Sequence, residues 1–227
     1  LRGTVERMLP AHDVYITDWA DAKLVPLSAG RFDLDDYIDY VVSFLEAIGA
    51  EGDPRAHMLA VCQPSVPCYA GFLQLAGFMT MNLGSHMISH WEMFKHLVQG
   101  DDSSAEATMA FYDEYRAVCD MTADFYLQTV DTVFQRHALP KGEMLHRGRP
   151  VDPAAIIDIG LLAIEGERDD ISGLGQTKAA LTLATALPEA MKRYHMAPEV
   201  GHYGIFNGSK WRTRIAPVVE EWIAAHA

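Results

Sequence analysis

His57-Met-Leu-Ala-Val-Cys-Gln-Pro64 is an apolar segment that runs directly into a cysteine, a polar residue and a proline. This arrangement is typical of a nucleophile elbow, a sharp turn from strand to helix with small residues two positions before and after the nucleophile. Ala60 and Pro64 hold those two positions around Cys62. Proline is tolerated there because its missing N–H would be unpaired in the first turn of a helix anyway. The stretch alone is not decisive, since a cysteine after an apolar run is also typical of a small core residue.

The residues before the elbow predict a strand, a helix and a second strand. Residues 13–18 have the β-branched and aromatic content of a buried strand, and Met58 to Val61 form the next one. Between them Asp33 begins a helix with apolar residues at intervals of three and four, and Gly49 is its stop signal. A βαβ unit of this kind predicts a parallel sheet with Cys62 at the carboxyl end of a strand, where α/β proteins build their sites.

The composition changes after the elbow to an apolar, methionine-rich and mainly helical region. Ser103-Ser-Ala-Glu106 is a capping box that predicts a long helix through Val133, and Pro140 ends it. We expect residues 69–150 to form a helical cap inserted between two parts of an α/β core, 1–68 and 151–227. Core helices are the plainer alternative, but thioether side chains also make an adaptable wall for an apolar substrate. The candidate substrate-binding residues are Phe72, Phe78, Met79 and Trp91.

An acid and a histidine follow in the last part of the chain. The segment 157–164 predicts a strand, and the loop after it carries Asp169 and Asp170. His202 lies in a glycine-flanked loop after a short edge strand at 193–196. The order nucleophile, acid, histidine is that of the α/β-hydrolases, so we predict this fold, with a mainly parallel sheet. Beyond the loop, Ser209 begins a final amphipathic helix that Pro217 should kink.

These three groups would work together as a triad. His202 would take the proton of Cys62 and lower the pKa of the thiol, and the carboxylate would hold the tautomer of the imidazole. From the residues alone, both aspartates remain open as the acid. The N–H of Gln63, the residue after the nucleophile, is the expected oxyanion donor.

An alternative hypothesis is a metal site at His86 and His90, which would share one face of a helix, with Glu92 and His96 as further ligands. The pair lacks the adjacent glutamate of the metalloprotease motif. We therefore expect no metal and no other cofactor.

The net charge of −13 would repel a phosphate backbone, which argues against nucleic acid as a partner. No apolar run approaches the ~20 residues that span a bilayer, so no membrane partner is expected. The only cysteines are Cys62, Cys68 and Cys119, without metal spacing and without a secretory signal before them. This usage predicts a reducing cytoplasm.

Several stretches resemble the intracellular polyhydroxybutyrate depolymerases, relatives of the polyhydroxyalkanoate synthases. They are residues 13–19, 30–39, 60–64, 71–75, 125–135, 139–142 and 201–208. The resemblance implies a cysteine-dependent α/β-hydrolase with Cys62 as nucleophile and His202 as base. The Asp-x-Ile pattern shared with the synthases puts the acid on Asp169. Against the family pattern, amino-terminal strands and a segment after the elbow, between Cys68 and Tyr69, are expected to be missing.

We therefore expect a granule-associated cytoplasmic depolymerase of poly(3-hydroxybutyrate), acting through a thioester to release 3-hydroxybutyrate monomers or oligomers. Transfer of the acyl group to coenzyme A and synthase-like polymerisation are enzymatic alternatives. A structural or regulatory granule protein is the non-enzymatic alternative. A homodimer is compatible with the sequence.

Overall fold

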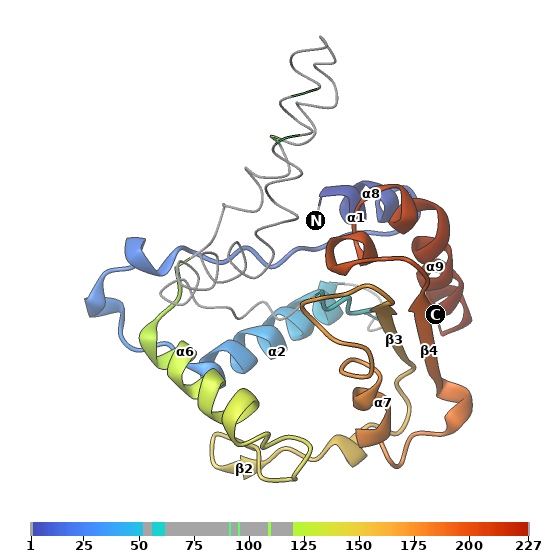
Figure 1. The fold of residues 1–227 in the computed structure, drawn as a ribbon. Coiled ribbons are helices and arrows are strands. Elements are labelled where there is room, and N and C mark those ends of the chain that lie inside the picture. Colours follow the sequence, from blue (N-terminus) through green and yellow to red (C-terminus); the bar gives the residue numbers. More distant parts are fainter. Residues whose placement is uncertain are drawn as a thin grey trace. The chain divides into compact units, whose positions relative to one another are not determined.

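The computed structural model describes residues 2–51, 56–61, 91, 95, 109 and 120–226. Its contacts divide the chain into two compact units. The first unit comprises Leu1–Thr17, Ser43–Val61 and His137–Ala227, and the second comprises Asp18–Val42 and Cys62–Arg136. In Figure 1 the blue start and the red end of the chain therefore belong to the same unit.

A parallel pair of strands forms the centre of the first unit. Strand β3, Leu161–Gly166, pairs with β4, Lys192–Ala197, in a register that runs from Leu161↔Lys192 to Gly166↔Ala197. The connection between them contains helix α7, Ala179–Leu183, which lies beside β3 in Figure 1. The predicted edge strand at 193–196 is confirmed. The predicted strand at 157–164 begins only at Leu161, because that residue faces the first residue of β4.

Helices from both ends of the chain cover this sheet. Figure 1 shows α1, Arg2–Met8, next to the short α8, Gly208–Lys210, and to α9, Ala216–Ala225. Their shared core consists of apolar side chains: Met8, Ala197, Val200, Trp211, Ile215, Ala216 and Val219. The predicted final helix is thus present but divided. A π-helical turn, Trp211–Ile215, separates α8 from α9, and Pro217 lies in the first turn of α9.

Helix α2, Leu34–Glu51, begins where the sequence places it. Asp33 and Asp36 form a reciprocal cap, in which the N–H of each residue donates to the carboxylate of the other, at 2.8 and 3.1 Å. The prediction that Gly49 ends this helix is wrong, since the helix continues to Glu51. Glycine lowers helix stability without forbidding helical backbone.

An aromatic cluster holds the second unit together. Trp19 stacks on Tyr37 with ring centroids 4.8 Å apart, and Tyr37 lies 5.3 Å from Phe125. Phe125 belongs to α6, Ala123–Thr129, which is capped by Thr122 and continues as a π-helical turn, Val130–Gln135. The prediction of one uninterrupted helix from Ser103 to Val133 is therefore wrong. Residues 120–122 are not helical, and the N–H of Asp120 there donates to Asp21 at 3.1 Å.

Two strands predicted before the elbow are absent from the described part of the chain. Residues 13–18 and 58–61 are irregular, and the side chains of Tyr15, Ile16 and Met58 are 60–68% exposed. Their amino-acid composition favours strands, but a strand also needs a hydrogen-bonded neighbour. The α/β-hydrolase fold and the division of the chain at residues 68 and 150 stay predictions.

A short hairpin was not predicted from the sequence. Strands β1, Leu145–His146, and β2, Arg149–Pro150, pair antiparallel across a turn in which Arg147 and Gly148 both have positive φ, 49° and 75°. Two consecutive positive φ values are the mark of a type I′ turn. The remaining short elements are 3₁₀ turns at Ala22–Leu24, Leu27–Ala29, Pro153–Ala155, Glu189–Met191 and His202–Ile205.

Candidate active site

Asp169 lies in the loop that follows β3, three residues after the strand ends. Its Oδ1 accepts hydrogen bonds from the N–H groups of Ile171 and Ser172, at 2.9 and 2.8 Å. The side chain is only 2% exposed. Asp170, the other candidate acid, is exposed. The local turn therefore turns the carboxylate of Asp169 inward and fixes one of its oxygens.

His202 begins the 3₁₀ turn that follows β4, directly after Gly201. Its ring is 7% exposed, and the rings of Tyr203 and Phe206 meet it edge-on at centroid distances of 5.7 and 5.8 Å. The Nδ1 atom lies 2.8 Å from Oδ2 of Asp169. An ionised carboxylate only accepts hydrogen bonds, so Nδ1 carries the proton in this pair. The other ring nitrogen, Nε2, is then the basic one in the neutral imidazole.

The segments that carry the two residues are tied to each other just beyond the strands. The N–H of Glu167 donates to the carbonyl of Ala197 at 3.0 Å, and the N–H of Arg168 donates to that of Val200 at 2.9 Å. Gly166 permits this approach, because a Cβ at that position would lie 2.5 Å from the carbonyl oxygen of Val200. The parallel pairing is thus extended into both loops, which fixes the separation of Asp169 and His202.

The turn before His202 contains a strained residue that is held in place by the acid loop. Glu199 has a φ of 59°, in the left-handed region that a residue with a side chain rarely adopts. Its N–H donates to the carboxylate of Glu167 at 2.7 Å, and its carbonyl accepts from Nζ of Lys210 at 2.6 Å. These bonds offset the conformational cost and keep the turn closed.

Glu165 is a buried polar residue of this region that was not among the residues predicted from the sequence. It is 2% exposed near the end of β3, and it accepts hydrogen bonds from Tyr194 Oη and from the N–H groups of Gly175 and Lys178. Burial would raise the pKa of the Glu165 carboxyl, but these hydrogen bonds outweigh it, and the net effect lowers that pKa below its ordinary value. A charged residue inside the otherwise apolar run Leu161–Gly166 was the signal in the sequence.

The other predicted site residues divide into two groups. Cys62, Gln63, Phe72, Phe78 and Met79 lie outside the described residues. Trp91 is described, with helical backbone and a side chain that is 59% exposed. The structure thus brings together Asp169 and His202, and the roles of the remaining residues stay predictions.

The rival metal site at His86, His90, Glu92 and His96 also lies outside the described residues. Within the described ranges, no three histidine, cysteine, aspartate or glutamate side chains are grouped so that they would hold a metal ion.

Residues 64–227 match the family described as the C-terminus of PHB depolymerase, where PHB is polyhydroxybutyrate. The chain belongs to this family. The match covers most of the chain, including both loops of the Asp169–His202 pair, and it begins two residues after Cys62. Comparisons with curated proteins and with solved structures gave no match.

Membership of the depolymerase family confirms the resemblance seen in the sequence. It indicates a hydrolase with a role in polyhydroxybutyrate breakdown, with the polymer as substrate and its granules as the associated structure. Among the helices that the structure describes, none is both long and apolar enough to cross a membrane.

Proposed function

We propose that this chain hydrolyses the ester bonds of poly(3-hydroxybutyrate) through a triad of Cys62, His202 and Asp169, on an α/β-hydrolase fold. The observation that carries the proposal is the contact of 2.8 Å between Nδ1 of His202 and Oδ2 of Asp169. Both residues follow the carboxyl ends of paired parallel strands, where open α/β sheets build their sites. The pair alone does not define a reaction, but in a depolymerase family it supports an acyl-transfer role.

The chemistry would proceed in two half-reactions. His202 removes the thiol proton of Cys62 through Nε2, and the thiolate attacks the ester carbonyl carbon. The N–H of Gln63 donates to the oxyanion that forms. When the intermediate collapses, the hydroxyl end of the remaining polymer leaves with the proton from His202, and a thioester stays on Cys62.

Water completes the second half-reaction. His202 takes a proton from a water molecule, which attacks the thioester carbonyl, and the hydroxy acid leaves as the thiol is restored. Asp169 stays ionised throughout and stabilises the imidazolium that forms in each step. The products are 3-hydroxybutyrate monomers or oligomers, released at the granule surface. Phe72, Phe78, Met79 and Trp91 remain our candidates for the apolar wall that receives the polymer.

Product analysis with amorphous poly(3-hydroxybutyrate) granules tests this function. The full chain should release free hydroxy acid at the same rate with and without coenzyme A. Cys62→Ala and His202→Gln should each reduce turnover by about 10⁴-fold or more while the folded protein still binds granules. If the product appeared only as a coenzyme A thioester, the reaction would be thiolysis and not hydrolysis. Equal, measurable rates for the wild type and Cys62→Ala would refute the triad. Granule binding by both proteins with no turnover in either would favour a granule-coating role.

A further inference from the structure

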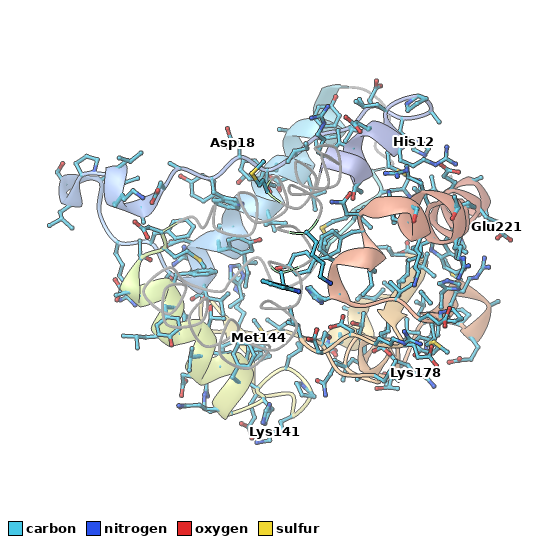
Figure 2. All side chains as sticks on the ribbon, turned by 45° about the horizontal axis from the view of Figure 1, so that its top comes forward. His12, Asp18, Lys141, Met144, Lys178 and Glu221 are labelled. Atoms are coloured by element: carbon cyan, nitrogen blue, oxygen red, sulfur yellow. The ribbon has the colours of Figure 1, made fainter. Side chains whose placement is uncertain are left out.

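Glu165 connects both ends of the loop that carries Asp169. The residue belongs to β3, and the loop begins after Gly166, the next residue and the last of the strand. Thirteen residues later the chain returns to the same side chain, because the N–H of Lys178 donates to Oε1 at 2.8 Å. Figure 2 labels Lys178, the residue at which this loop closes. The side chain of Glu165 therefore holds the end of the loop close to the strand from which the loop starts.

Two further donors hold the second oxygen of the carboxylate. The N–H of Gly175 donates to Oε2 at 2.9 Å, and Tyr194 Oη in the neighbouring strand β4 donates to the same atom at 2.8 Å. Gly175 has a φ of 96°, which allows its N–H to point back toward the strand. A buried site with a backbone N–H aimed at each oxygen favours an ionised carboxylate, which accepts at both positions and donates at neither.

The last part of the loop also helps to hold the donors that bind the carboxylate of Asp169. Ile171 and Ser172, whose N–H groups donate to Oδ1 of Asp169, lie between the start of the loop and its anchor at Gly175. Displacement of Gly175 would move these two donors and release the carboxylate from its fixed orientation. Charge-assisted hydrogen bonds of this kind depend steeply on distance and angle.

We propose that Glu165 is a positioning residue of the active site, which fixes the loop 167–178 so that Asp169 keeps its hydrogen bond to His202. This inference rests on the proposed function, because it assigns Glu165 an effect on the same triad. The hydrogen bonds of Glu165 run to the backbone of Gly175 and Lys178 and to Tyr194 Oη. Glu165 acts through the backbone of the loop.

Glu165→Gln tests the proposal, because it keeps the size of the side chain and replaces one acceptor oxygen with an NH₂ group that faces donors. Turnover of polymer granules should fall by about 10- to 100-fold, the effect of a misplacement near 1 Å, with a smaller change in KM. The proton NMR resonance of the His202 ring Nδ1–H should shift or broaden. Glu189→Gln is the matched control, because Glu189 is an exposed glutamate of the same unit that pairs with Lys192. It should leave both readouts unchanged.

Tyr194→Phe is a second, milder variant that removes one donor to Glu165 and no carboxylate. This variant should lower turnover severalfold and shift the resonance of the His202 Nδ1–H. If Glu165→Gln does not fold, Tyr194→Phe is the test of the positioning role. Wild-type turnover together with an unchanged His202 resonance, in whichever of the two variants folds, would overturn the inference.

Asp169→Asn and His202→Gln separate this failure from a failure of the proposed function. If these two variants keep wild-type turnover, the triad itself is wrong. If they lose turnover while Glu165→Gln keeps it, only the positioning role is wrong.

Discussion

At the scale of single residues, Asp169 and Asp170 are neighbours with opposite environments. Asp169 is buried against His202, and Asp170 is exposed. We expect Asp169→Asn to reduce kcat by about 10⁴-fold, because the amide would leave the imidazole in the wrong tautomer. Asp170→Asn makes the same chemical change one position away and should leave kcat within twofold. Steady-state hydrolysis of polymer granules measures both, and equal losses in the two variants would contradict the assignment of the acid.

The lowered pKa of Glu165 makes a prediction about stability and pH. Burial alone would raise this pKa, but the hydrogen bonds from Gly175, Lys178, Tyr194 and Thr177 lower it below the ordinary 4.5. The unfolded chain therefore binds this proton more readily than the folded one, and the carboxylate stabilises the fold above pH ~4.5. This contribution is lost as the pH falls through the folded-state pKa.

Urea unfolding of the wild type and Glu165→Gln at two pH values checks this expectation. The wild type should have the larger free energy of unfolding near pH ~7, and the difference between the proteins should shrink toward pH ~3. A difference that stays constant over this range would show that the charge of Glu165 is not what stabilises the loop.

At the scale of elements, the close approach of the acid loop and the histidine turn depends on Gly166. A Cβ at this position would meet the backbone oxygen of Val200 at 2.5 Å, and backbone cannot swing aside as a side chain can. Gly166→Ala should lower the free energy of unfolding by about 1–3 kcal/mol and also lower kcat, because the turn before His202 must shift. Gly173→Ala is the matched control in the same loop, since its Cβ would meet nothing within 4 Å. Urea unfolding and turnover of both variants test this prediction. Equal free energies of unfolding and equal kcat values in the two variants would contradict the steric argument.

Elements defined by local signals were predictable from the sequence, and those that need a distant partner were not. The start of α2 follows from Asp33 and Asp36, which cap each other within one turn. The strand predicted at 13–18 has suitable residues but no ladder in the described structure, because strand formation depends on a neighbour that composition does not reveal. The non-helical backbone at 120–122 was missed for the same reason, since the bond from Asp120 to Asp21 spans ninety-nine positions.

At the scale of the whole molecule, the loops that carry Asp169 and His202 could be predicted from the two strands before them. The loops after two predicted strands supplied His202 and two candidate acids, and the family resemblance chose Asp169 between them. Parallel pairing of β3 with β4 brings those loops to one edge. The hydrogen bonds that hold the two loops together at this edge of the sheet could not be predicted from the sequence. They are backbone bonds from Glu167 and Arg168 to the segment at 197–200, whose pairing depends on register.

The unit that carries the Asp169–His202 pair is built from both ends of the chain, so its stability should depend on the first helix. Met8 of α1 is 7% exposed in the core with Trp211 and Val219, and Arg7 pairs with Glu220 at 2.8 Å. Met8→Ala should therefore lower the free energy of unfolding by about 2–5 kcal/mol, through lost burial and the cavity left behind.

Leu9→Ala removes a similar apolar side chain at the next position, where Leu9 is 54% exposed. It should change the free energy of unfolding by about 0.5 kcal/mol or less. Urea unfolding of the two variants measures the difference between their free energies of unfolding. Turnover at temperatures well below the unfolding midpoint should stay near wild type in both variants, since neither residue contacts the Asp169–His202 pair. If Met8→Ala were no more destabilising than Leu9→Ala, α1 would not be part of the core that supports the site.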